Sequence, residues 1–190
     1  MRWLMLYARS RQVPTSAAAV TLVALAAWAF EHDGAGPMDL GIVVLVLTAN
    51  VAAASVGLGG QDAALDRTAA IRWMPRRAAH VLLAGAVAGA ALLGVQAAGP
   101  KLAPAGLVVR DSAGLIGLAA LGAVLCGAQF AWTLPIGWLA FTLLVPVPRG
   151  IAGEVGDWMI ISPATTASAV TAWALLATGT VLYAAAGPRR

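Results

Sequence analysis

The stretch from Ser112 to Val147 reads SAGLIGLAALGAVLCGAQFAWTLPIGWLAFTLLVPV and contains no charged residue. A helix needs about 20 apolar residues to cross the hydrocarbon core of a bilayer. This stretch is far longer than one crossing requires, and Pro135 interrupts it. It therefore predicts two membrane spans, 112–132 and a shorter 134–147, joined by a tight turn near 131–135.

The composition of the whole chain agrees with a membrane protein. Of its 190 residues, 61% are hydrophobic and only 11% are charged, and the mean hydropathy is +0.84. Soluble domains carry about 25% charged residues, so a soluble enzyme, a secreted disulfide scaffold and a disordered chain are excluded. The single Cys126 excludes an internal disulfide. The predicted fold class is all-α, a single polytopic integral membrane domain.

Four further apolar runs have the length of a membrane span: 13–30, 38–58, 78–98 and 163–186. The first also resembles a cleavable signal peptide, because three arginines precede it and Ala27-Trp28-Ala29 has a small-x-small cleavage pattern. An uncleaved anchor is favoured, since five further spans follow. The sequence thus predicts six spans.

The distribution of basic residues predicts the orientation. With the N-terminus inside, nine of the twelve Lys and Arg fall in cytoplasmic segments, and only Lys101, Arg110 and Arg149 fall outside. Cytoplasmic loops carry the excess of Lys and Arg, so both termini are predicted to be cytoplasmic. The nine are Arg2, Arg9, Arg11, Arg67, Arg72, Arg76, Arg77, Arg189 and Arg190.

Three segments outside the spans have a distinctive pattern. Residues 1–12 interleave aromatic and apolar residues with arginines, which indicates either an interfacial helix or a positive flank that sets topology. Residues 61–74 predict a cytoplasmic helix with Leu65, Ala69 and Trp73 on one stripe, ended by Pro75. It is either a docking element for a soluble partner or a surface helix packed on its own bundle.

The external segment 148–162 is apolar for a loop, and it carries Trp158, a residue suited to the membrane interface. A partly re-entrant segment and a loop that touches the headgroups are equally compatible with it. In the third span, Gly85 and Gly89 predict close helix packing, within the chain or in a dimer.

Few polar residues fall at membrane depth, and these are candidates for a substrate pathway. Arg110 and Asp111 are placed at the edge of the fourth span, where they reach water and neutralise each other. No carboxylate lies at mid-span, which counts against a proton-coupled transporter. The candidates are Asn50, Gln96, Gln129, Arg110 and Asp111.

Several kinds of chemistry are absent from the sequence. There is no GxxxxGK[ST] phosphate-binding loop, and the two histidines, His32 and His80, fall at loop edges. No catalytic residues and no metal site are predicted, and the chain is not expected to be an enzyme by itself. The basic residues segregate by loop rather than forming one patch, so no nucleic-acid partner is expected.

The layout resembles the permease subunit of a type-2 ATP-binding-cassette (ABC) exporter. The corresponding stretches are 2–12, 62–73 and 149–162, for the connecting helix, the coupling helix and the external re-entrant helices. Asp66-Arg67, followed by the Pro-Arg-Arg at 75–77, is similar to the coupling motif of this family. Ile161-Ser162-Pro163 is similar to its step into the last span. A composition rich in Ala, Gly, Val and Arg is typical of a high-GC, actinobacterial-like bacterial genome.

The resemblance implies a separate cytoplasmic ATP-binding subunit, which holds ATP and Mg, and a homo- or heterodimer with another membrane subunit. This chain would bind no cofactor and would sit in the bacterial cell membrane, moving a hydrophobic, peptide or lipid-like substrate. The alternatives are a scaffold or accessory subunit without transport activity and a small secondary transporter. The implied docking residues are Asp62, Leu65, Asp66, Arg67 and Trp73.

Overall fold

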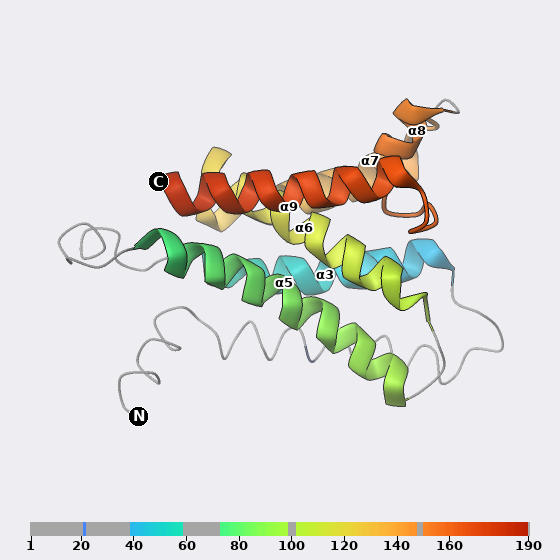
Figure 1. Ribbon diagram of the computed structural model, residues 1–190, viewed down its shortest axis with the longest axis horizontal. Coiled ribbons are helices and arrows are strands. Elements are labelled where there is room, and N and C mark those ends of the chain that lie inside the picture. The colour runs from blue at the N-terminus through green and yellow to red at the C-terminus, as the bar shows by residue number, and fades with distance from the viewer. Residues whose placement is uncertain (1–20, 22–38, 59–72, 99–101, 148–149, 190) are drawn as a thin grey trace.

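The computed structural model describes residues 21, 39–58, 73–98, 102–147 and 150–189 (Figure 1). The described residues from position 39 onward are mainly helical, and none of them lies in a strand. The helices are α3 (Leu40–Ser55), η1 (Val56–Leu58), α5 (Trp73–Ala98), α6 (Ala105–Leu125), η2 (Ala128–Phe130), α7 (Thr133–Leu144), α8 (Ile151–Gly156) and α9 (Thr166–Ala186).

Four of these helical segments are long and apolar enough to cross a membrane: Leu40–Leu58, Trp73–Ala97, Ala105–Leu125 and Thr166–Ala186. The large side chains that they expose are mainly apolar, whereas Asn50, Arg110, Asp111 and Ser168 are buried between helices. A surface of this kind needs a lipid solvent rather than water. The prediction of a helical membrane protein is confirmed at this level.

Helix α6 is the centre of the bundle. It packs against α3, α5, α7 and α9 (Figure 1). In its most apolar stretch of 18 residues, 78% is buried, against 22% in the corresponding stretch of α9. Gly117 of α6 and Gly179 of α9 meet backbone to backbone, and a Cβ at either position would overlap the other helix. Small residues allow this close approach, which adds dispersion contacts that lipid cannot replace.

Two of the predicted spans agree closely with the structure. The run 38–58 becomes α3 followed by η1, and its first turn is capped by Asp39, whose carboxylate accepts a hydrogen bond of 2.7 Å from the Gly41 N–H. The run 163–186 becomes α9, which ends at Gly187 in the left-handed region with a φ of 72°.

The fourth span was predicted seven residues too late along the chain. It was placed at 112–132, but α6 occupies Ala105–Leu125. Pro104 precedes its first turn, and Gly127, with a φ of 105°, prevents the helix from continuing. Arg110 and Asp111 therefore lie within α6 and not at the edge of the span.

The prediction that Pro75 separates the cytoplasmic helix from the third span is wrong. Helix α5 begins at Trp73, ahead of the predicted start at 78, and Pro75 is its third residue. A proline is tolerated in the first turn because the N–H that it lacks would have no intrahelical partner there. Trp73 and Met74 therefore belong to a helix that is long and apolar enough to cross a membrane.

The segment predicted as the fifth span, 134–147, forms the 12-residue α7. Together with η2 it makes up the apolar helical segment Ala128–Leu144, which is shorter than the four candidate spans, so the fifth span stays a prediction. The interfacial helix 1–12, the first span 13–30 except Thr21, and residues 61–72 of the cytoplasmic helix lie outside the described residues.

Candidate functional site

A buried polar cluster lies around the second turn of α6. Arg110 and Asp111 expose only 3% and 0% of their surface, and the Arg110 Nε donates to Asp111 Oδ1 at 2.8 Å. The Arg110 Nη1 donates to Ser168 Oγ of α9 at 3.0 Å, and Nη2 lies 3.5 Å from the Met159 carbonyl oxygen. One guanidinium therefore connects α6, α9 and the turn that precedes α9.

The expectation that Arg110 and Asp111 reach water at the edge of a span is wrong. Since α6 starts at Ala105, both residues fall inside the helix, and α9 and the turn before it cover Arg110. The two residues do neutralise each other, as expected. A buried charge needs such a partner, because the desolvation of an unpaired guanidinium in the bundle costs several kcal/mol.

Residues 150–162 contribute to this cluster. Helix α8 is attached to α7 through its Gly156 carbonyl, which accepts hydrogen bonds from Trp138 Nε1 at 3.0 Å and Thr142 Oγ1 at 3.2 Å. The turns that follow bury Trp158 and Met159 completely, with the Trp158 ring against Gly114 of α6. Trp158 is thus a core residue and not the interface anchor that the sequence suggested.

Ser168 was not singled out from the sequence. It is one of several serines, and its Oγ accepts from Arg110 while donating to the Thr165 carbonyl at 2.9 Å within its own helix. Nothing local distinguishes it from other serines at helix starts. Its role depends on the packing of α6 against α9, which brings together residues far apart in sequence.

The other predicted pathway residues do not join the cluster. Asn50 is fully buried in α3, and neither polar atom of its amide has a hydrogen-bond partner among the residues that the structure describes. Gln96 is half-buried near the end of α5. Gln129 is an exposed residue of η2, outside the four helical segments that are long enough to span a membrane.

Gly85 and Gly89 form a packing surface for α6 within the chain. A Cβ at Gly85 would overlap Ile116, and one at Gly89 would overlap Ser112. The sequence left open whether these glycines pack helices within the chain or in a dimer, and the structure shows packing within the chain. Within the described parts of the chain, no group of three or more His, Cys, Asp or Glu side chains could hold a metal ion.

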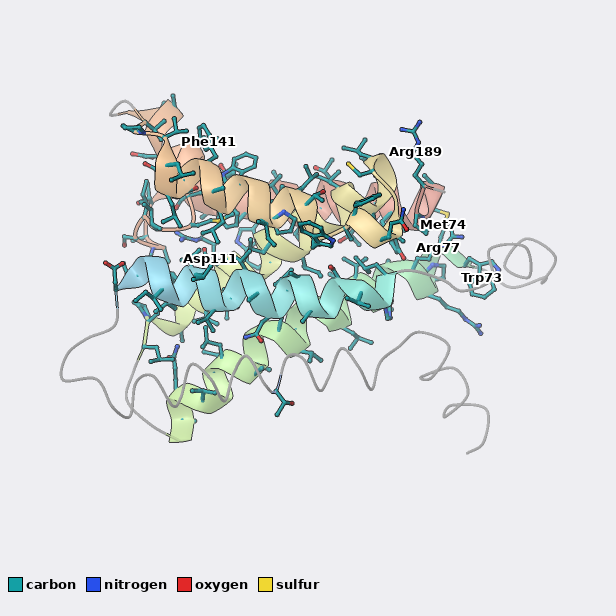
Figure 2. All side chains as sticks on the ribbon, turned by 180° about the vertical axis from the view of Figure 1, so that it is seen from behind. Trp73, Met74, Arg77, Asp111, Phe141 and Arg189 are labelled. Atoms are coloured by element: carbon teal, nitrogen blue, oxygen red, sulfur yellow. The ribbon has the colours of Figure 1, made fainter. Side chains whose placement is uncertain are left out.

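The opposite end of the bundle carries basic side chains. Here α3 ends, α5 begins, and α6 and α9 end, so that Trp73, Met74, Arg77 and Arg189 lie together while Asp111 lies toward the other end (Figure 2). Arg76 lies over the Trp73 ring, 6.0 Å from its centroid.

Hydrogen bonds hold this end together through the carbonyls that follow α3. Tyr183 of α9 donates to the Leu58 carbonyl at 2.5 Å, and His80 Nε2 of α5 lies 2.9 Å from the Gly57 carbonyl oxygen. Of the residues that the resemblance implied for docking, Trp73 lies here, at the start of α5. The other four, Asp62, Leu65, Asp66 and Arg67, lie outside the described residues.

Comparison with known proteins gives no relative: no protein family, curated protein or solved structure matches this chain.

Proposed function

We propose that this chain is the transmembrane subunit of an ATP-driven exporter that moves a hydrophobic, peptide or lipid-like substrate. A separate cytoplasmic subunit would bind ATP and Mg and supply the energy. In this proposal the chain crosses a bacterial cell membrane six times, with both termini in the cytoplasm, and pairs with a second membrane subunit.

One observation carries the proposal. Leu58, bonded to Tyr183, and Trp73 flank residues 59–72, and both lie at the end of the bundle that also holds Arg77 and Arg189, with Arg76 over the Trp73 ring. Cytoplasmic ends of membrane helices are enriched in Lys and Arg. The segment that resembles a coupling helix is thus connected to the bundle at its basic end, where a cytoplasmic ATPase would reach it.

The contacts at this end supply a route for mechanical coupling. A force on residues 59–72 reaches Gly57 and Leu58 directly, and their carbonyls are bonded to His80 of α5 and Tyr183 of α9. Helices α6 and α9 are locked by the contact between Gly117 and Gly179 and would move as one unit. In this mechanism, α3 and α5 shift relative to the α6–α9 pair.

A scaffold or accessory subunit is the second candidate. The Arg110 cluster and the close contact between α6 and α9 favour it, because both stabilise one fixed arrangement of the bundle. A scaffold needs such rigidity, whereas a transporter needs a second arrangement of the same helices.

The test is purification of the tagged full chain from its membrane, followed by identification of its partners and measurement of Mg-ATP hydrolysis. The exporter proposal expects the chain to copurify with a partner that has a GxxxxGK[ST] loop. The Leu65→Asp variant should retain at least ten-fold less of this partner. The control variant Ala63→Asp, on the other side of the predicted helix, should retain as much of it as the wild type. A stable complex without any ATP-binding subunit would contradict the exporter and support the scaffold.

A further inference from the structure

Three arginines, Arg76, Arg77 and Arg189, lie at the end of the bundle where α5 begins and α6 and α9 end. The Arg77 guanidinium lies directly against Gly187, the residue that ends α9. The Arg189 N–H donates to the Ala123 carbonyl at 2.9 Å and its Nη1 to the Leu125 carbonyl at 3.2 Å, both near the end of α6. Arg76 precedes Arg77 on α5, and its guanidinium lies over the Trp73 ring, 6.0 Å from the centroid.

These three charges have no carboxylate partner among the described residues. The described acids are Asp39, Asp111, Glu154 and Asp157, and the one ion pair between described residues is that of Arg110 with Asp111. The sequence of residues 59–72 adds two acids and two arginines, which leaves the net charge unchanged. Each guanidinium has five N–H donors, and the Arg189 side chain uses one of them in the contact above.

The surroundings of the three arginines are apolar and exposed. Met74 exposes 57% of its surface and Leu125 exposes 55%, and the carbonyl of Leu125 is the acceptor for Arg189. A soluble anion would contact only the arginine charges. A phospholipid would contact the arginines with its phosphate and the exposed apolar side chains with its acyl chains.

We propose that this basic end, defined by Arg76, Arg77 and Arg189, binds the phosphate headgroup of an anionic membrane phospholipid. Arginine is suited to this ligand because its planar fork of donors matches the phosphate oxygens. The site needs only a chain embedded in a bilayer, so it stands independently of any ATP-binding partner.

The experiment uses the purified full chain in detergent, without partners. It measures binding of phosphatidylglycerol and phosphatidylcholine with identical acyl chains by native mass spectrometry. Wild type is expected to prefer phosphatidylglycerol by at least about five-fold, because each basic residue near the headgroups contributes about that factor. The preference should weaken as salt is raised, since exposed charges are screened.

Arg76→Gln and Arg189→Gln should each lower the preference about five-fold or abolish it, while the matched control Arg149→Gln should leave it unchanged. Arg76 makes no hydrogen bond in the described structure, so its variant is expected to fold even where loss of Arg77 or Arg189 weakens a helix end. Arg189→Lys keeps the charge and should retain most of the preference.

Equal binding of the two lipids by wild type would overturn the proposal, and so would an unchanged preference in the Arg76→Gln, Arg189→Gln double variant. Competition by millimolar inorganic phosphate would also overturn it, because the site would then recognise a free anion rather than a lipid. If the purification experiment found no ATP-binding partner, the exporter proposal would fail, but the measured lipid preference would still test the lipid site.

Discussion

Arginine side chains at the two ends of the bundle lie in opposite environments. Arg110 is buried in the second turn of α6, with its guanidinium bonded to Asp111 and Ser168 and directed at the Met159 carbonyl. Arg76 and Arg189, at the other end, are exposed and have no carboxylate partner among the described residues.

The difference follows from the cost of desolvation. Inside the bundle neither water nor headgroups can solvate a guanidinium, so the protein must supply an opposite charge and hydrogen-bond acceptors. At the end of the bundle, water and lipid phosphates do this, and the arginine remains free to bind something else. Substitutions at the two ends should therefore differ strongly in their effects.

The largest effect is expected from Arg110→Leu. It leaves the Asp111 carboxylate buried without its partner, and the free energy of unfolding should fall by about 3–5 kcal/mol. Chemical unfolding of the purified chain in detergent micelles, followed by the loss of helical circular dichroism, measures the change.

The control is the double variant Arg110→Leu, Asp111→Leu, which removes both charges together. It should recover most of the lost stability, because a buried ion pair replaced by apolar residues is often neutral or better. If the double variant were as unstable as Arg110→Leu, the charge account of this cluster would be wrong.

Ser168→Ala should have a smaller effect. The variant removes the acceptor for Arg110 Nη1, and hydrogen bonds to charged groups contribute about 1.5–3 kcal/mol. Ser112→Ala is the matched control, because the Ser112 hydroxyl donates only to the Val109 carbonyl of its own helix, at 3.0 Å. The same unfolding measurement should show a clear loss for Ser168→Ala and little change for Ser112→Ala; equal losses would argue against a bond between α6 and α9.

The smallest effect on stability is expected from Arg76→Gln. Among the described residues, its guanidinium has only a weak contact over the Trp73 ring, and surface substitutions usually change stability by less than about 0.5 kcal/mol. The unfolding curve should stay close to that of the wild type. If Arg76→Gln lowered the free energy of unfolding as much as Arg110→Leu, the arginines at the basic end would stabilise the fold, and the two ends would not differ.

The sequence located most of the helices but not their ends. Apolar run length placed α3 and α9 to within a few residues, because a fixed bilayer thickness demands runs of fixed length. It misplaced α6 and α5, where the ends are set by Pro104, Gly127 and the toleration of Pro75 in a first turn. The fifth span stays a prediction, because the apolar helical segment Ala128–Leu144 is shorter than the four candidate spans.

For the candidate site, the sequence identified Arg110 and Asp111 as a neutralised pair but not their burial. The shift of α6 by seven residues carries both into the bundle. Ser168 and Met159 could not have been predicted as partners, because each lies more than forty residues away and meets Arg110 only through helix packing.

The sequence alone determined that this chain is a helical membrane protein, where several of its helices run and which end carries the arginines. These are properties of run length and composition, which depend on the solvent rather than on neighbours. Only the tertiary structure decided which polar residues are buried, which glycines meet and which arginine is paired. Those outcomes depend on contacts between segments distant along the chain, and no local pattern of residues encodes them.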